Sequence, residues 1–406
     1  MGAHLTTRCC SALALTLAIA CAPAPTATRS FPAPRSTDSN RSKADAAPLP
    51  LFPVAPIWTL ALNNTLAAPP VFDRDRAFFA IEGNRIVAYD LARGTQSWIV
   101  QAATAIQPAA SPELLFVVEP RQLAALRVTD GSPAWTLPFA DAPAAPPTWD
   151  NGWLIVATLD GAVHALRAAD GKRIWRQTIG SPAHAPPALA ADRVYIAAED
   201  GRIVALRVDT GALLWERRLG GTPSEILALD DRVYVGSKDN FLYSLKTDTG
   251  ERDWRWGAGA DVIGLPAIDE RTVYCVSLAN VLWALNRNTG NLRWKRALPL
   301  RPTSGPIEAG QTLLVSGVSQ APKLPAFTAK DGTPAGDITA GGEIAAPMQS
   351  TTLSGVYGPV VMLITQDIVK GATVTAYARS LEPPIAPVSP LSGLETLTPA
   401  APPPPK

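Results

Sequence analysis

Tryptophan recurs at a near-constant interval of about 40 residues through most of this 406-residue chain. The recurring tryptophans are Trp58, Trp98, Trp135, Trp175, Trp215, Trp254 and Trp294. Six of them follow a glycine by four places and an alanine or serine by ten places, and the cleanest copy runs from Ala205 through Gly211 to Trp215. A fixed period of this length indicates repeated structural units that stack or stand in a ring.

Each unit contains four short apolar runs separated by turn residues. In residues 186–220, runs rich in Val, Ile, Leu and Tyr are separated by Glu-Asp-Gly and by Asp-Thr-Gly, which is typical of antiparallel strands rather than helices. The second turn carries a glycine because a tight turn often needs a positive φ, which costs glycine nothing. These glycines are Gly94, Gly131, Gly171, Gly211, Gly250 and Gly290, with Gly332 in the next unit. Four strands in about 40 residues match one blade of a β-propeller.

Eight units can be counted from the stretches of proline or small residues that open them, near residues 70, 108, 147, 187, 226, 266, 306 and 347. The eighth supplies only three apolar runs, and the run around Trp58 precedes any complete unit. We expect that run to complete the eighth blade, which removes two exposed sheet edges. The sequence therefore predicts an all-β, eight-bladed β-propeller of four-stranded antiparallel blades, with the ring closed by an N-terminal strand. The seventh blade is expected to be degenerate, with Ala335 where the period calls for tryptophan.

The phrase with alanine first, glycine seventh and tryptophan eleventh resembles the tryptophan-docking motif of the quinoprotein (PQQ-type) β-propeller superfamily. The resemblance covers about residues 54–380. It implies that the tryptophans and glycines listed above dock repeats together, with the small residue leaving room for a neighbouring indole. The superfamily includes quinone-dependent dehydrogenases, BamB-like outer-membrane assembly lipoproteins, and sensor or scaffold propellers, so the resemblance leaves several functions open.

The two ends of the chain differ from the repeats. Residues 1–20 combine a basic start with a short apolar run, as in a secretory signal peptide. The segment Leu-Ala-Ile-Ala-Cys resembles a bacterial lipobox, which implies a diacylated Cys21; an ordinary signal peptide cut nearby is the alternative. We predict a flexible Pro/Ala/Ser-rich tether at residues 21–52, the propeller at 53–381, and a Pro-rich disordered tail at 382–406. Because Ala22 rather than aspartate follows the cysteine, we expect an outer-membrane anchor that faces the periplasm.

The charge is nearly balanced, with 36 Lys and Arg residues against 35 Asp and Glu residues. The basic residues are scattered mostly singly along the chain, without the basic stripe of a nucleic-acid-binding protein. We therefore expect no nucleic-acid partner, and contact with the membrane through the lipid anchor only.

The sequence carries no constellation typical of an active site. Quinone-dependent dehydrogenases, which the chain resembles in fold, typically carry an adjacent cysteine pair against the cofactor, with Glu and Asn ligands to calcium and an Asp base. The adjacent cysteines here, Cys9 and Cys10, lie in the expected signal peptide, and Cys275 lies in a buried-strand pattern. His164 alternates within a strand and His184 lies in a loop, without the convergent ligands of a metal site. We predict no enzymatic activity, no cofactor and no metal.

Binding to a protein is the remaining kind of function, and a rigid ring with loops at both ends suits it. The loop at residues 297–306 resembles in composition the Leu-and-Arg loop by which BamB-type proteins hold the barrel-assembly component. That resemblance offers Leu298, Leu300 and Arg301 as contacts; an ordinary linker is the alternative. We predict a monomeric, non-catalytic envelope scaffold that resembles the BamB-type component of outer-membrane β-barrel assembly. The alternatives are a ligand-binding or sensor propeller of the periplasm and, from another class, a PQQ-dependent dehydrogenase.

Overall fold

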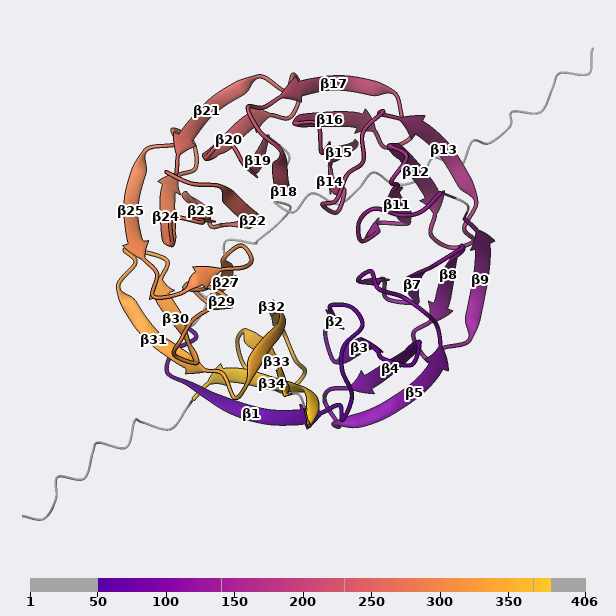
Figure 1. Ribbon diagram of the computed structural model, residues 1–406, viewed down its shortest axis with the longest axis horizontal. Helices are drawn as coiled ribbons and strands as arrows, with labels where there is room; N and C mark the ends of the chain where they lie inside the picture. Colours follow the sequence, from indigo (N-terminus) through magenta and orange to yellow (C-terminus); the bar gives the residue numbers. More distant parts are fainter. Residues whose placement is uncertain (1–49, 140, 230, 368, 381–406) are drawn as a thin grey trace, which may run out of the picture. The chain divides into compact units, whose positions relative to one another are not determined.

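The computed structural model describes residues 50–380, apart from residues 140, 230 and 368. Eight four-stranded antiparallel sheets stand as blades in a ring, and the described residues form no helix (Figure 1), so none could cross a membrane as a helix. The predicted fold class is therefore confirmed. The predicted signal peptide, Cys21 and the C-terminal tail lie outside the described residues.

The blades follow the chain, and the first strand of each lies nearest the central axis (Figure 1). Blade 1 consists of β2 (Val71–Asp73), β3 (Arg76–Ile81), β4 (Arg85–Asp90) and β5 (Thr95–Gln101); blade 2 of β6 (Ala109–Ala110), β7 (Leu114–Glu119), β8 (Gln122–Arg127) and β9 (Pro133–Pro138). Blade 3 consists of β10 (Thr148–Asp150), β11 (Trp153–Ala157), β12 (Ala162–Arg167) and β13 (Arg173–Thr178); blade 4 of β14 (Ala188–Ala190), β15 (Arg193–Ala197), β16 (Arg202–Arg207) and β17 (Leu213–Arg218).

The second half of the ring repeats this pattern. Blade 5 consists of β18 (Pro223–Ala228), β19 (Arg232–Ser237), β20 (Phe241–Lys246) and β21 (Arg252–Gly257); blade 6 of β22 (Val262–Ile268), β23 (Thr272–Ser277), β24 (Val281–Asn286) and β25 (Leu292–Ala297). Blade 7 consists of β27 (Ile307–Ala309), β28 (Thr312–Leu314), β30 (Lys323–Thr328) and β31 (Pro334–Thr339), and β26 (Arg301–Pro302) pairs with β29 (Gly317–Val318) beside it. Blade 8 consists of β32 (Glu343–Thr351), β33 (Val360–Asp367), β34 (Gly371–Arg379) and β1 (Val54–Ala61).

Burial explains the composition of the strands. The second strand of a blade is covered on both faces by its neighbours, so it reads as a continuous apolar run; every residue of β11 is buried. The outermost strands alternate instead, because one face packs on the next blade and the other meets water. In β17 only Trp215 is fully buried, between exposed Leu214 and exposed Glu216. The hydrophobic core is therefore a set of layers between blades.

The N-terminal strand closes the ring as predicted. β1 pairs antiparallel with β34 in a register that runs from Val54 opposite Arg379 to Ala61 opposite Thr373. The chain just before β1 is also held, since the Ser380 N–H donates to the Pro53 carbonyl at 2.7 Å. Leu51 has no exposed surface. Leu51, which the prediction assigns to the tether, is therefore packed against the propeller.

Polar contacts join blade 8 to blade 1 at the same closure. The Gln349 side-chain amide donates to the Pro70 carbonyl at 3.0 Å. The backbone N–H of Ser354 donates to one oxygen of Asp75 at 2.6 Å, and its hydroxyl donates to the other. These bonds link residues that lie 279 positions apart in the chain.

We expect this joint to weaken in acid. The hydrogen bonds from Ser354 lower the pKa of Asp75 below its usual value of 3.8. A carboxyl group with a lowered folded-state pKa stabilises the fold above its unfolded-state pKa, and this contribution is lost as the pH falls through the folded-state pKa. Thermal unfolding at about pH 6 and about pH 3 should show that Ser354→Ala loses less stability on acidification than the native chain. The difference should stay below about 1 kcal/mol because Asp75 faces water; equal losses would contradict the prediction.

Candidate functional site

Six of the recurring tryptophans lie between one blade and the next. Each indole covers the glycine of the following blade's last turn so closely that an added Cβ would come within 3.0 Å of the ring. Each indole N–H also donates to the carbonyl three residues before that glycine, at 2.7–3.2 Å. The pairs are Trp98–Gly131, Trp135–Gly171, Trp175–Gly211, Trp215–Gly250, Trp254–Gly290 and Trp294–Gly332. Each joint combines ring packing with a directional hydrogen bond.

The small residue of the repeat acts within its own blade. Ala205 lies directly opposite Trp215 on one neighbouring strand and opposite Tyr195 on the other. The two rings meet across the alanine with their centroids 5.8 Å apart. A larger side chain at position 205 would separate them, and such aromatic pairs contribute about 0.5–1.5 kcal/mol beyond their burial. The small side chain of Ala205 therefore makes room for the tryptophan of its own blade, and not for a tryptophan that reaches it from a neighbouring blade.

Trp58 is placed differently from these six. It lies in β1 opposite Ala376 and packs on the cluster that contains Phe79 and Leu91. The turn of blade 1 carries Gly94 at the docking position, but nothing lies within 4 Å of a Cβ built there. Trp58 thus packs at the closure without covering the glycine that follows it in the ring.

Blade 7 has no docking tryptophan, and the register corrects which residue replaces it. Gly336, not Ala335, lies opposite Ala326 on β30. The ring of Phe52 covers Gly336, since an added Cβ would lie 2.5 Å from two of its carbons. An aromatic ring from the N-terminal segment thus packs against Gly336, the residue equivalent to the docking tryptophan of the other blades. The apolar pair Leu51 and Phe52, directly before the first strand, was the sequence signal for this contact.

The architecture explains why this one tryptophan is missing. In the other joints the indole covers a turn that connects the third and fourth strands of the next blade. Blade 8 has no such turn, because its third strand, β34, and its fourth strand, β1, come from opposite ends of the chain. Phe52 and Leu51 pack at this position instead, in the cluster that also contains Ile338.

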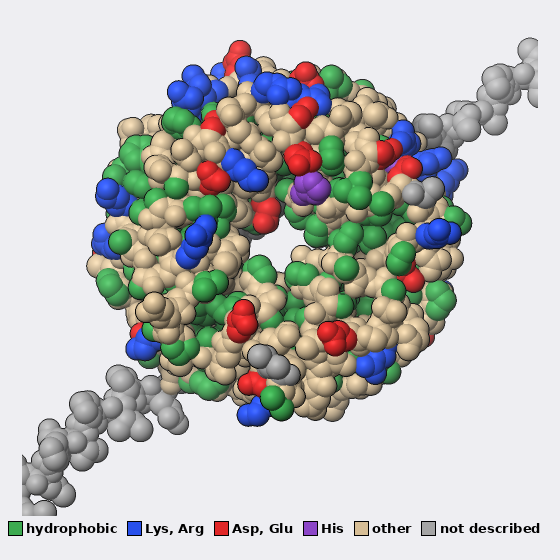
Figure 2. All heavy atoms as spheres, viewed as in Figure 1, with side chains coloured by type: hydrophobic (Ala, Val, Ile, Leu, Met, Phe, Trp, Pro, Cys, Tyr) green, Lys and Arg blue, Asp and Glu red, His purple; other side chains and the backbone are tan. Residues whose placement is uncertain are grey.

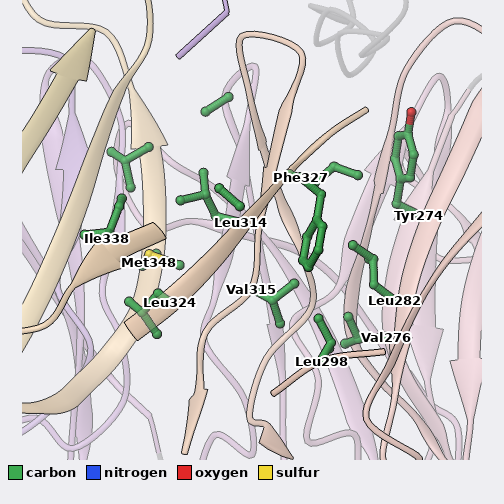
Figure 3. Close-up of a cluster of buried hydrophobic side chains, with 14 of the residues drawn as sticks. Tyr274, Val276, Leu282, Leu298, Leu314, Val315, Leu324, Phe327, Ile338 and Met348 are labelled. Atoms are coloured by element: carbon green, nitrogen blue, oxygen red, sulfur yellow. The ribbon is translucent and has the colours of Figure 1, made fainter. Parts of the chain in front are cut away.

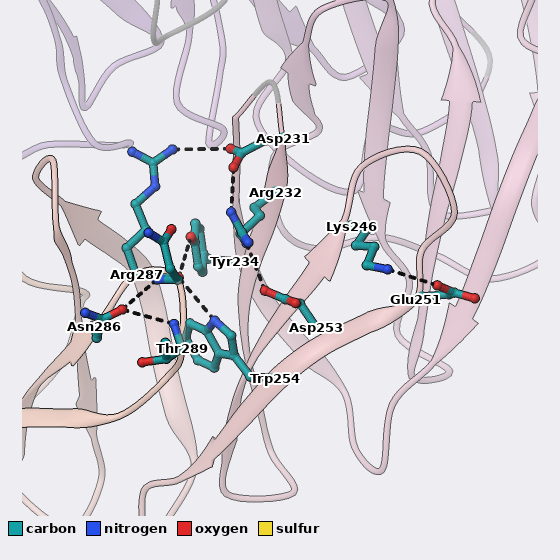
Figure 4. A network of polar contacts seen from close by, with 11 residues as sticks. Asp231, Arg232, Tyr234, Lys246, Glu251, Asp253, Trp254, Asn286, Arg287 and Thr289 are labelled. Atoms are coloured by element: carbon teal, nitrogen blue, oxygen red, sulfur yellow. Dashed lines mark hydrogen bonds and ion pairs between the residues drawn. The ribbon is translucent and has the colours of Figure 1, made fainter.

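A charged network reinforces the joint between blades 5 and 6 (Figure 4). Arg287, after the third strand of blade 6, reaches Asp231 of blade 5 at 3.3 Å, and Arg232 connects Asp231 at 2.6 Å to Asp253 at 3.0 Å. The carbonyl of Arg287 accepts the indole N–H of Trp254 at 3.1 Å. Because Asp231 is half exposed, the network orients the blades more than it stabilises them.

The predicted partner loop separates into buried and exposed residues. Leu298 and Leu300 are 7% and 2% exposed and belong to the core between blades 6 and 7, where Leu298 lies near Val276 and Leu282 (Figure 3). The structure therefore does not support the two leucines as partner contacts, because their side chains are enclosed. Arg301 is exposed in β26.

Arg301 lies on a small exposed strip beside blade 7. It pairs with Val318 of β29, whose side chain is 68% exposed. A cavity of about 210 Å³ lies next to the strip, lined by Pro299, Ser319 and Lys323 among others. The strip joins the connection between blades 6 and 7 to the connection between the second and third strands of blade 7. Both connections lie on the same face of the ring, because successive strands run in opposite directions. An exposed valine beside an arginine that forms no ion pair within the described part of the chain is a surface that a protein partner can cover.

The titratable side chains named by the sequence are dispersed. His164 is buried against Phe139, with Nε2 3.2 Å from Asp141; burial lowers the pKa of His164, and the Asp141 carboxylate partly offsets this. His184 is exposed and lies 3.3 Å from Glu199. They belong to different blades and do not converge on a common centre.

The residues present do not fit a quinone and calcium site of the kind that the superfamily resemblance implies. The described residues contain one cysteine, Cys275, and burial raises the pKa of its thiol to about 12, which keeps it protonated and unreactive. Within residues 50–380, excluding the three omitted positions, no three His, Cys, Asp or Glu side chains are grouped as metal ligands would be.

The ring geometry and the repeated joints agree with a comparison of the sequence to protein families. The family described as "Outer membrane protein assembly factor BamB" matches residues 55–144, 121–228 and 223–357, which span most of the propeller. The chain belongs to this family. No curated protein sequence matches it significantly.

Solved structures show the same fold. The crystal structure of BamB from Moraxella catarrhalis has a TM-score of 0.64 and 21% identity over 81% of this chain and 98% of its own. The computationally designed Ika8 protein has a TM-score of 0.63 and 11% identity over 82% of this chain and 100% of its own. Quinohemoprotein alcohol dehydrogenase from Comamonas testosteroni has a TM-score of 0.62 and 13% identity over 80% of this chain and 76% of its own. One fold thus serves a BamB, a designed protein and an enzyme, and function depends on the site.

Proposed function

We propose that this propeller is a non-catalytic scaffold of the cell envelope that holds a component of the outer-membrane β-barrel assembly machinery. The observation that carries the proposal is membership of the BamB family over most of the ring. The six equivalent tryptophan joints support it, because they make a rigid frame that presents loops in fixed positions.

The proposal also covers the cellular location of the protein. Acylation at Cys21 would tether the ring to the outer membrane on its periplasmic side, with the remaining N-terminal residues as a spacer. The propeller acts as a monomer in this proposal, and the nearly balanced charge argues against nucleic acid as its partner.

We place the partner contact at the strip formed by Arg301 and Val318. Arg301 is the exposed residue of the two-residue strand β26, and Val318 directly opposite offers apolar surface. Arginine with a neighbouring apolar side chain is a frequent combination at protein interfaces. The buried Leu300 supports this strip from beneath, since a Cβ on Gly317 would lie 2.6 Å from its side chain.

Photo-crosslinking in the native envelope tests this proposal. A photoreactive amino acid at position 318 should capture a component of the barrel-assembly machinery, whereas one at position 159 should not. Leu159 is a matched control because it is 51% exposed on the equivalent turn of blade 3. Arg301→Glu should lower the yield from position 318 at least about tenfold, equivalent to about 1.4 kcal/mol. Capture of equal amounts from both positions, or of no assembly component, would refute the proposal.

A further inference from the structure

The basic residues of the outermost strands lie on one half of the ring. The outermost strands of blades 3–6 carry nine basic residues, whereas those of blades 7, 8, 1 and 2 carry none. The nine, here called the basic belt, are Arg173, Arg176, Arg217, Arg218, Arg252, Arg255, Arg293, Lys295 and Arg296. Figure 2 shows Lys and Arg side chains along the edge over β13, β17, β21 and β25. Residues about 40 positions apart in the chain thus become neighbours in the ring.

The acidic residues of these strands do not neutralise the basic belt. Glu216 and Asp253 are the two carboxylates in the four strands, and each pairs with an arginine outside the belt, Arg202 at 2.9 Å and Arg232 at 3.0 Å. Within the described part of the chain, only Arg176 and Arg218 of the belt lie within 4.0 Å of a carboxylate. Seven belt cations therefore have no ion-pair partner there.

A groove of about 660 Å³ lies in the middle of the basic belt, between β17 and β21. Four belt arginines line it: Arg217, Arg218, Arg252 and Arg255. The lining also contains two acidic residues: Asp239 accepts the Tyr243 hydroxyl at 2.5 Å, and Glu251 lies 3.3 Å from Lys246. Four guanidinium groups against two carboxylates leave the lining of the groove with a net positive charge.

Neutral groups hold two of these arginines in place. The Nε of Arg217 donates to the Gly250 carbonyl at 2.8 Å, and the guanidinium of Arg255 lies 4.3 Å from the centre of the Phe241 ring. These contacts fix the orientation of each side chain and leave its charge available. A planar guanidinium with a fixed orientation suits bidentate recognition of a carboxylate.

We propose that the groove between β17 and β21 binds an acidic, extended segment of a partner protein, and that the rest of the basic belt guides that segment along the wall. An extended peptide fits because β17 is the last strand of its sheet and has one edge without a neighbouring strand. Exposed Leu213 and Leu214 on the same strand offer apolar contacts beside the arginines. A flat membrane touches a round wall along one line only, so it would leave most of a belt over four blades without contact.

This surface is distinct from the strip at Arg301, and the proposal does not depend on the barrel-assembly role. The probe for the test is a fluorescein-labelled oligoglutamate peptide of about eight residues, roughly 26 Å long when extended. Fluorescence anisotropy with the full chain, carrying Cys21→Ser to prevent acylation, should show saturable binding that weakens with salt. An oligoglutamine peptide of equal length should not bind.

Two charge-matched variants decide the location. Arg252→Glu with Arg255→Glu should weaken oligoglutamate binding at least about twentyfold, because it reverses both charges of β21 in the groove. Lys330→Glu with Lys370→Glu changes the net charge equally, at exposed turns of blades 7 and 8, and should change binding less than about twofold. Arg252→Gln with Arg255→Gln removes both charges without reversing them and keeps part of each aliphatic side chain, so it should give an intermediate loss of oligoglutamate affinity. Thermal unfolding verifies that each variant is folded.

Three outcomes would overturn the proposal. The first is no saturable binding of oligoglutamate, and the second is equal weakening in both charge-reversed variants, which would show an effect of net charge alone. The third is binding to phosphatidylglycerol vesicles that depends on Arg252 and Arg255 while the peptide does not bind, which would assign the groove to anionic lipid. The crosslinking yield at position 318 is independent of all three.

Discussion

Gly250→Ala is expected to destabilise the propeller by about 2–4 kcal/mol more than Gly94→Ala. The two glycines occupy equivalent turns and have nearly equal φ values, +66° and +67°, so alanine incurs the same backbone cost at each. They differ in what a methyl group meets: the Trp215 indole within 3.0 Å at Gly250, and nothing within 4 Å at Gly94. The extra loss at Gly250 therefore measures the indole contact itself.

Denaturant unfolding of the two variants and the native chain measures this difference. At Gly250 the methyl group must push the ring away, which disturbs the 2.8 Å hydrogen bond from the Trp215 indole to the Thr247 carbonyl. At Gly94 alanine incurs only the cost of holding a residue with a Cβ at a positive φ, about 1–2 kcal/mol. Equal destabilisation in the two variants would show that the joint depends on the turn conformation and not on the indole.

Removing residues 54–62 is expected to open the ring and cost at least about 5 kcal/mol, comparable to the total stability of an ordinary domain. The deletion removes β1, exposes the edge of β34, and uncovers the cluster on which Trp58 and Leu60 pack. An open edge of this length invites pairing with other chains. We expect aggregation and rapid proteolysis, measured by light scattering and limited digestion.

A rearranged chain is the control for that deletion. Val54 lies directly opposite Arg379, so a short turn can join the end of β34 to the start of β1. A chain that begins after residue 62 and ends with β1 in this position should recover most of the lost stability. Failure of this chain to recover it, or an unchanged melting transition in the deletion variant, would contradict the view that β1 closes the ring.

Much of the fold follows from local patterns in the sequence. The spacing of Trp215 and its equivalents, the glycines four places earlier, and the missing fourth strand of the last unit predict eight blades and their closure, because each repeat has the same register of strands and turns. Local patterns did not locate the substitute for the seventh tryptophan. Gly336, four places after Gly332 and ten places after Ala326, takes the position rather than Ala335, and Phe52 arrives from the other end of the chain.

The candidate surfaces were harder to predict. The composition of the loop at residues 297–306 suggested three contacts, but composition does not show which way a side chain points, and packing encloses Leu298 and Leu300 while it leaves Arg301 exposed. The residues of the basic belt looked scattered along the chain because only two or three of them occur in each of four successive repeats. Only the ring aligns them on neighbouring outer strands.

The sequence by itself thus determined the repeat, the number of blades and the strand that completes the last one, since these depend on spacing within about 40 residues and on turn chemistry. The tertiary structure decided what lies at the closure, which loop residues face water, and where charge accumulates. These depend on contacts between residues far apart in the chain: Phe52 with Gly336, Asp75 with Ser354, and β17 beside β21. The first two contacts arise only when the ring closes and the third only when neighbouring blades pack, so no pattern within one repeat encodes them.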